Sequence, residues 1–291
     1  MPAVFLADRG IVRVAGADAR TFLDGLVTSA MDKVTPRQSR WTALLSPQGK
    51  ILFDFIVFEA PDGGFLLDVG RAVAPDLAKR LGFYKLRAKV EVADVSEGFG
   101  VLASWDEPPA GDEAAVETVD PRWPAMGLRA ILPRDRAAAR ATADGDAYHA
   151  RRVLMGIPEG GRDFVYGDAF PHEADMDQLA GVDFDKGCFV GQEVVSRMQH
   201  RGTARTRLVP VTFADGVSPP EGTEAMAGGK AAGRVYSAAP GGRALAMLRL
   251  DRVEDALAAG EALEAGGLAF SLSRPDFATF PIPGVPAKPD A

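Results

Sequence analysis

The hydrophobic pattern of the chain changes once, after Arg207. Before that point, short alternating runs typical of strands are interleaved with stretches whose apolar residues recur at helical spacing. After it, runs at 208–213, 231–236, 244–249 and 269–272 alternate with turns rich in glycine and proline. Strands and helices joined by hairpins favour α+β units, whereas short, regularly spaced strands favour a small β-barrel.

This pattern predicts the domain organisation. Residues 1–206 are expected to form an α+β region of two units, which divide near residue 95 and need not be contiguous. Residues 207–280 are expected to form the β-barrel, and the proline-rich segment 281–291 to be a disordered tail. A chain of 291 residues, 47% of them hydrophobic, is long enough for two or three packed units with a substantial core.

Local signals predict individual elements of the first region. Strands are expected at 11–14, 41–45 and 51–58, and the turn residues Ser46–Lys50 favour a hairpin between the last two. Asp18 is expected to cap a helix whose buried face consists of Ala19, Phe22, Leu23, Leu26 and Val27. A loop is expected over 106–124 and a surface helix over 134–144.

Charge and composition exclude some classes of protein. The formal net charge of -7 and the pI of about 5.1 argue against a dedicated nucleic-acid or membrane-surface binder, although a local basic patch remains compatible with them. No apolar stretch is long enough to span a bilayer, and the first residues lack the apolar core of a signal peptide. A single cysteine allows no intrachain disulfide, which suits a reducing compartment. We therefore expect a cytoplasmic protein with no membrane partner.

The most informative segment surrounds that cysteine, Cys188. Gly187 and Gly191 bracket the thiol, and a helix is predicted from Gln192 onward. A helix N-terminus and the nearby Lys186 both stabilise a thiolate, which predicts a lowered pKa and a functional role for Cys188. The alternative from spacing alone is a small buried hydrophobic residue.

The segment Lys186–Glu193 resembles the K-G-C-[YF]-x-G-Q-E signature of the YgfZ-type family of iron–sulfur assembly and repair proteins. Further likeness extends over 11–28, over the hairpin at 44–50, over the basic stretch 197–207 and over 244–249. The family is related to the T-protein aminomethyltransferases of glycine cleavage.

The resemblance implies a fold and a function. The implied fold is α+β: two ferredoxin-like units and a C-terminal β-barrel around a central cavity of the size of folate. The implied cofactor is tetrahydrofolate. The implied role is support of the maturation or repair of iron–sulfur enzymes, including tRNA-modifying ones, with iron–sulfur carriers or clients as partners and no firmly attached turnover reaction.

Candidate cofactor contacts follow from the chemistry of a pterin. Its amide–amidine edge pairs with a carboxylate, which makes Asp54 and Glu173 candidates; both match acidic positions of the related families. The signature supplies Lys186, Gln192 and Glu193. Arg197, followed by three more arginines up to Arg207, could meet the anionic tail of folate or an RNA phosphate, or simply form a solvated surface.

Other functions are weighed against this one. A folate-dependent aminomethyltransferase is the alternative, but Leu154 stands where T-proteins carry a glutamate in an R-x-E-x-G segment. No histidine has a context that would make it a base for a cysteine nucleophile. One cysteine and three scattered histidines supply no metal-ligand pair, so Cys188 is expected to hold a transient cluster only with ligands from a partner.

Overall fold

The computed structural model describes residues 2–106, 116–202 and 204–287 of the chain. The chain packs as two compact units, each of which is described separately. The first unit contains Met1–Tyr148 and Leu179–Ser196, and the second contains His149–Gln178 and Arg197–Ala291. The thiol loop thus belongs to the first unit, although it lies far along the chain.

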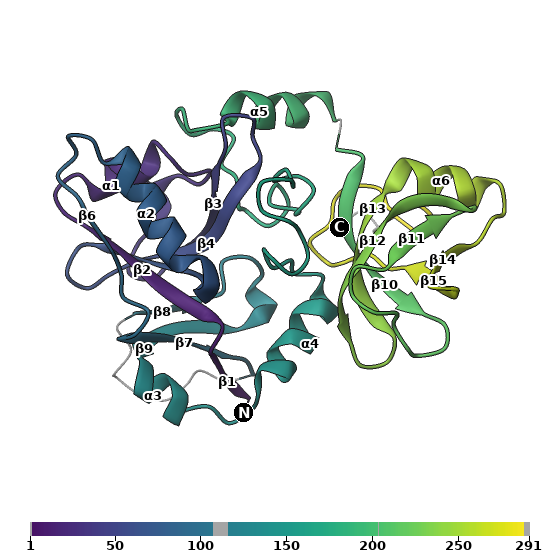
Figure 1. Ribbon diagram of the computed structural model, residues 1–291, viewed down its shortest axis with the longest axis horizontal. Helices are drawn as coiled ribbons and strands as arrows, with labels where there is room; N and C mark the ends of the chain where they lie inside the picture. The colour runs from purple at the N-terminus through teal and green to yellow at the C-terminus, as the bar shows by residue number, and fades with distance from the viewer. Residues whose placement is uncertain (1, 107–115, 203, 288–291) are drawn as a thin grey trace. The chain divides into compact units, whose positions relative to one another are not determined.

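A five-stranded antiparallel sheet forms the centre of the first unit (Figure 1). Its strands lie in the order β3-β4-β5-β2-β6, with bounds Arg40–Leu45, Ile51–Glu59, Phe65–Gly70, Arg9–Ala15 and Glu91–Asp94. Leu45 pairs with Ile51, so the predicted hairpin is present at Ser46–Lys50. The helices α1 (Ala19–Asp24) and α2 (Ala74–Tyr84) cover one face of the sheet.

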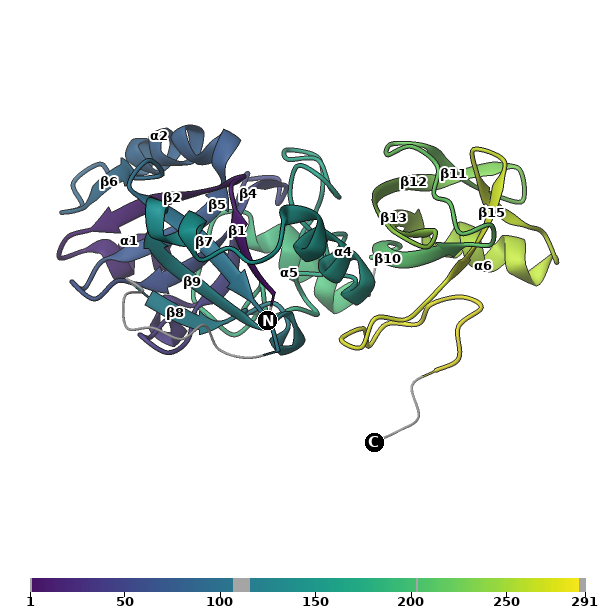
Figure 2. The same cartoon turned by 90° about the horizontal axis from the view of Figure 1, so that it is seen from below.

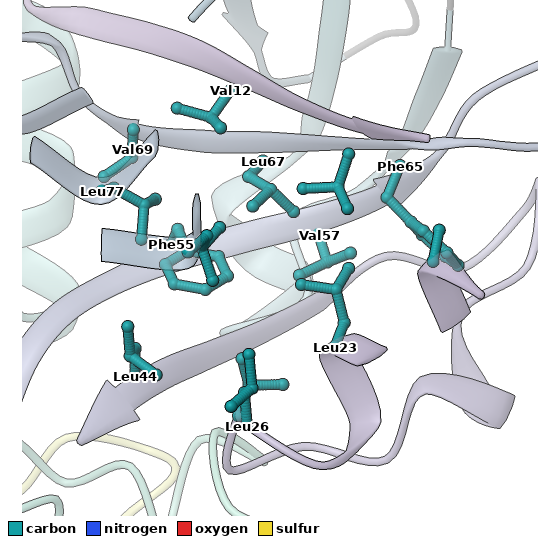
Figure 3. Close-up of a cluster of buried hydrophobic side chains, with 14 of the residues drawn as sticks. Val12, Leu23, Leu26, Leu44, Phe55, Val57, Phe65, Leu67, Val69 and Leu77 are labelled. Carbon is teal, nitrogen blue, oxygen red and sulfur yellow. The ribbon is translucent and has the colours of Figure 1, made fainter. Parts of the chain in front are cut away.

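The hydrophobic core of the first unit lies between this face and the two helices. Phe55 and Val57 of β4 point into it because alternate residues of a strand share a face. Figure 3 shows Leu23 of α1 and Leu77 of α2 gathered over these strand residues. Asp18 stands at the N-cap position of α1, but its carboxylate accepts a hydrogen bond from the backbone N–H of Lys89 (2.7 Å) and makes no cap bond. The predicted cap is therefore wrong, because a donor from a distant segment takes the side chain.

A second antiparallel sheet of the first unit has the order β1-β7-β9-β8 (Figure 2). Its bounds are Ala3–Leu6, Phe99–Ser104, Leu128–Pro133 and Val116–Val119. Strand β8 lies inside the segment predicted to be a loop, of which 107–115 falls outside the described residues. The predicted helix at 134–144 is the shorter α3 (Arg134–Ala139), and α4 (Gly145–Met155), which was not predicted, follows it.

Buried ion pairs join the two sheets. Asp68 of β5 accepts hydrogen bonds from Arg9 Nε (2.7 Å) and from Arg129 Nε of β9 (2.5 Å), and its side chain is fully buried. Burial alone would raise the pKa of Asp68, but the charges of Arg129 and Arg9 outweigh it and the pKa is lowered. Asp68 is therefore ionised at neutral pH and compensates two buried arginines.

The second unit contains a closed six-stranded β-barrel, which confirms the predicted fold. Its strand order is β10-β13-β12-β11-β14-β15, with bounds Thr206–Phe213, Arg243–Arg249, Lys230–Ala239, Glu224–Ala227, Leu263–Ala265 and Leu268–Leu272. The barrel includes a helix that was not predicted, α6 (Leu250–Ala258). In the segment predicted to be a tail, Ile282 is buried, and 288–291 lies outside the described residues.

Replacing Asp68 with asparagine is expected to lower the free energy of unfolding of the first unit by about 3–5 kcal/mol. The change leaves two buried guanidinium groups without their carboxylate. Urea unfolding followed by tryptophan fluorescence measures this unit selectively, because the three tryptophans, Trp41, Trp105 and Trp123, all belong to it.

Asp62→Asn is the matched control. Asp62 is an exposed carboxylate that pairs with Arg13, so its loss should cost no more than about 1 kcal/mol. Equal effects of the two substitutions would contradict the structural role of Asp68.

Candidate functional site around the Cys188 loop

Cys188 is exposed and lies four residues before α5 (Gln192–Arg201). A methyl group added at the neighbouring Gly187 would meet no atom within 4 Å. The thiol is therefore accessible, and the chain beside it leaves room for another molecule to approach.

Lys186 anchors this loop to the end of α1. Its ammonium donates hydrogen bonds to the backbone carbonyls of Asp24 (2.7 Å), Val27 (2.7 Å) and Ser29 (3.0 Å), and its side chain is 2% exposed. Burial lowers the pKa of Lys186, while the nearby carboxylate of Asp24 acts in the opposite direction. An ammonium has three donors, so these carbonyls leave none for the sulfur of Cys188. The sequence argument placed this charge beside the thiolate, but the structure uses it to hold the backbone.

Two glycines fix the other end of the loop. Gly191 adopts φ +81°, and a Cβ at this position would lie 2.6 Å from the carbonyl oxygen of Ser46. Gly49 adopts φ +80°, and a Cβ there would lie 3.0 Å from Cβ of Val194. The hairpin between β3 and β4 therefore packs directly against the first turn of α5, which only glycine permits at these positions.

The remaining signature residues lie along the start of α5. Gln192 is half-buried, whereas Glu193 is exposed in the first turn, where a carboxylate is favourable to the helix dipole. Arg197 is exposed further along the same helix and belongs to the second unit.

A polar cavity of about 410 Å³ lies beside the thiol loop within the first unit. It is lined by Arg20, Thr21, Asp24, Ala30, Asp32, Lys33, Asp185, Lys186 and Gly187. Among the described residues, no group of three or more His, Cys, Asp or Glu side chains could hold a metal ion.

Asp54 lies on β4, on the face of the sheet opposite the core that contains Phe55 and Val57. It is 4% exposed, and its Oδ2 accepts a hydrogen bond from Trp41 Nε1 (2.9 Å). This bond orients the carboxylate of Asp54.

The candidates in the second unit have local structural partners. Glu173 is half-buried, and its Oε2 accepts a hydrogen bond from the backbone N–H of Phe170 (2.8 Å). Arg207 is buried and donates to both oxygens of Asp177 (2.6 and 2.9 Å), and its guanidinium lies 4.5 Å from the ring centre of Phe280. Of the predicted basic stretch, Arg197, Arg201 and Arg205 are exposed. Arg207 is therefore not part of a solvated basic surface.

The position at which T-proteins carry a glutamate is solvent-facing here. Leu154 is 54% exposed on α4. Its neighbour Arg152 is fully buried and donates to Asp163 Oδ2 (2.5 Å) and Ser237 Oγ (2.6 Å) of the same unit. The segment thus keeps its structural arginine and lacks the carboxylate.

Sequence reasoning missed a cavity of about 530 Å³ in the second unit. Its walls include His172, Gln199, Arg207 and Phe280, together with Pro281–Pro283 of the segment predicted to be a tail. The apolar Phe280 and Ile282 were the available signal, because isolated apolar residues in a proline-rich segment can mark a packed strap.

Comparison with known proteins defines the class of protein first. Residues 7–105 match the family model of the GCVT N-terminal domain, and residues 205–280 match that of the CAF17 C-terminal β-barrel domain. The fold is similar to that of the glycine cleavage system aminomethyltransferase T from Bartonella henselae, with a TM-score of 0.76. At 18% identity, over 95% of this chain and 86% of that one, the likeness shows the fold alone.

The family follows from closer relatives. The human iron–sulfur cluster assembly factor IBA57, mitochondrial, is 33% identical over 94% of this chain and 84% of its own length. The IBA57 homologue of Pyricularia oryzae is 33% identical over 92% of this chain and 77% of its own. The chain belongs to this CAF17/IBA57-type family of GCVT-like proteins, and the predicted YgfZ-type label denotes a related but different subfamily.

The match is shorter for other relatives. The IBA57 homologue of Mycosarcoma maydis is 36% identical over 73% of this chain, and the alignment spans 57% of that protein. For the homologue of Neurospora crassa the span is 54% of its length. The chain therefore spans slightly more than half the length of these two fungal relatives.

The expectation of a cytoplasmic protein is wrong, because these relatives are named as mitochondrial factors. A low cysteine content indicates only a compartment that keeps thiols reduced, and it does not distinguish one such compartment from another. In the part of the chain that the structure describes, no helix is long and apolar enough to cross a membrane.

Replacing Lys186 with methionine is expected to loosen the thiol loop. Three backbone carbonyls would lose a charged donor, each such bond contributing about 1.5–3 kcal/mol. Backbone amides of 184–190 should then exchange with solvent deuterium at least about tenfold faster, as followed by mass spectrometry.

Lys33→Met serves as the control. Lys33 makes a half-exposed ion pair with Asp183 of the same segment, so its loss should accelerate exchange in the loop less than the loss of the buried Lys186 does. Unchanged exchange in the Lys186 variant would show that the loop is held by other contacts.

Proposed function

We propose that the protein is an accessory factor for the assembly of iron–sulfur clusters in client enzymes, and that Cys188 is its working residue. Membership of the IBA57-type family supports the role. The single observation that carries the site is the exposed thiol of Cys188 on a loop fixed at both ends, by Lys186 and by Gly191.

The chemistry of one thiol limits what the protein does alone. Iron–sulfur clusters are usually held by four cysteine thiolates, and this chain has one cysteine. Cys188 therefore supplies one ligand, and a carrier or client protein supplies the others. The cluster is cargo that passes between partners, which suits an accessory factor better than a cluster-holding enzyme.

We also propose that the protein binds a reduced folate. Asp54 supports this: it is a buried carboxylate oriented by Trp41, and a carboxylate is the group with which a pterin edge pairs. Leu154 in place of a glutamate argues against aminomethyl transfer, so folate acts in this proposal as a ligand and not as the acceptor of glycine cleavage. The predicted use of tRNA-modifying clients and the contact with tRNA remain predictions that the relatives' names do not support.

Cys188→Ser is expected to abolish support of a [4Fe–4S] client while leaving the fold intact. The substitution exchanges sulfur for oxygen at an exposed position, so the free energy of unfolding should change by less than about 0.5 kcal/mol. The measurement is client enzyme activity in cells that lack the native gene and carry the variant.

Gly187→Ala provides a graded comparison. Open space surrounds this position, so the fold should tolerate alanine, yet the added methyl stands beside the thiol and should reduce client activity partially. Full client activity with the serine variant would overturn the proposed role of Cys188.

Folate binding is tested by calorimetric titration with tetrahydrofolate. Asp54→Asn removes one charge at nearly constant volume and should weaken binding roughly ten- to hundred-fold. Asp62→Asn, at an exposed carboxylate of the same unit, should leave the affinity unchanged. A flat trace with the unmodified protein at millimolar ligand would refute the folate proposal without affecting that for Cys188.

A further inference from the structure

We propose that the surface at the end of α2 is the docking site for an acidic protein partner that reaches Cys188. We call it the α2-end surface; it consists of Lys79, Arg80, Phe83, Lys85, Leu86 and Arg87. The inference rests on the proposed function in one respect, namely that the partner is an iron–sulfur protein.

Two large apolar side chains of this surface face solvent. Phe83 is 66% exposed and Leu86 is 91% exposed. Leu86 also adopts φ +39° inside a turn closed by a hydrogen bond from the backbone N–H of Ala88 to the carbonyl of Lys85 (2.7 Å). Left-handed backbone costs a branched-chain residue about 1–2 kcal/mol, and glycine or asparagine is favoured at such positions. Neither the exposure nor the conformation of Leu86 stabilises the isolated fold, so a bound partner accounts for both.

The turn that carries Leu86 is rigidly built. Asp18 accepts a hydrogen bond from the backbone N–H of Lys89, and Ala88 packs on the main core of the first unit. A Cβ at Gly16 would lie 2.2 Å from the carbonyl oxygen of Lys89, so the two segments are in close contact. The apolar side chains are thus presented in a fixed position, which reduces the entropy that binding costs.

The chain around the two apolar side chains is rich in basic residues. Residues 79–90 contain five lysines and arginines and no acidic residue, within a chain of net charge -7. Within the described ranges, the side chains of Lys79, Arg80, Lys85 and Arg87 take part in no ion pair or hydrogen bond. Four exposed cations without acidic partners complement a negative surface on another molecule.

A protein partner fits these features better than a membrane or a nucleic acid. A bilayer presents anionic headgroups over a wide plane, which would repel the remaining, even more acidic part of the chain. Single-stranded nucleic acid is bound by stacking successive bases on several aromatic side chains, and this surface offers one aromatic ring, Phe83, beside the aliphatic Leu86. A partner protein with an apolar depression surrounded by carboxylates would accommodate both the exposed leucine and the cations.

The segment that directly follows the α2-end surface in the chain and the thiol loop contact opposite ends of α1. Asp18 precedes the helix and holds Lys89, whereas Lys186 binds the carbonyl of Asp24 at its last turn. Six helical residues span only about 9 Å. An interface of standard size, about 800 Å² on each partner, is roughly 30 Å across and can cover both places.

The test places a photoreactive benzoylphenylalanine at position 83 of the full chain, in cells that lack the native gene. The expected result is an adduct with an acidic iron–sulfur protein. The adduct should be lost in a Lys85→Glu/Arg87→Glu background and be restored when facing carboxylates of the captured protein are changed to lysine. With that captured protein purified, the Kd should rise at least about tenfold for the charge-reversed variant.

Two controls make the result specific. Arg37→Glu/Lys230→Glu changes the net charge equally at exposed positions elsewhere and should leave binding unchanged. The photoreactive group at Val217, an exposed apolar position of the barrel unit, should not capture the same protein.

Other outcomes would overturn the proposal. One is that the charge-reversed variant binds the captured protein as tightly as the unmodified protein does. Another is that the protein sediments with phosphatidylcholine–phosphatidylserine vesicles and captures no protein. The proposal would also be overturned if the unmodified protein bound a single-stranded RNA oligonucleotide and the charge-reversed variant did not. Failure of the proposed function would give a different result. The Cys188→Ser variant would then keep client activity, while the adduct at position 83 would still form, be lost on charge reversal and be restored by the compensating change in the partner.

Discussion

A single buried ammonium group determines where the thiol of this protein stands. The ammonium of Lys186 donates its three hydrogens to backbone carbonyls at and just after the end of α1. Two further hydrogen bonds attach the same segment: the carbonyl of Gly181 accepts from Thr28 Oγ1 (2.6 Å), and Asp183 accepts from the backbone N–H of Ala30 (2.8 Å). The segment 181–186 is thus joined to residues 24–33 mostly by hydrogen bonds. Because each of these bonds has a preferred direction, they fix the position of the loop more sharply than apolar packing does. Cys188 is left exposed on a rigid support.

The same unit uses charge for a different purpose between its sheets. Asp68 with Arg9 and Arg129, and Asp120 with Arg122, form buried pairs in which Tyr148 also accepts hydrogen bonds from both Arg122 and Arg129. Buried ion pairs add little net stability relative to apolar packing, but they penalise any register in which a charge lacks its partner. We interpret the network as a constraint on how the two sheets align, which in turn holds the face on which Asp54 lies.

The sequence predicted the features that are determined by residues close together in the chain, and it did not predict contacts between residues far apart in the chain. The hairpin at Ser46–Lys50 and the core face of β4 follow from turn chemistry and from alternation over a few residues. Strands β10, β12, β13 and β15 of the barrel follow for the same reason, whereas the short β11 and β14 were not predicted. Helix α6 was missed although Leu250, Val253 and Ala256 recur at helical spacing, since the surrounding strand pattern dominated the interpretation. The partners of Lys186 lie more than 150 residues away in sequence, and Asp177 binds Arg207 across 30 residues, so neither could be derived from spacing. Motif chemistry singled out Lys186 but did not predict that its ammonium binds the backbone carbonyls of a distant segment.

One thiol would suffice for the proposed accessory role. A site with four thiolates would hold a cluster tightly, and its release would then be slow; one thiolate binds weakly and lets a partner complete and remove the cluster. Weak ligation needs compensation from contacts elsewhere on the surface, because the partner must stay long enough for exchange. The proposed α2-end surface would supply such contacts without adding a ligand. A fixed distance between the thiol and the docking surface then matters more than the affinity of either site alone, because two linked sites bind a partner best when their spacing matches it. The hydrogen bonds of Lys186 at one end of α1 and of Asp18 at the other set that distance through six residues of helix.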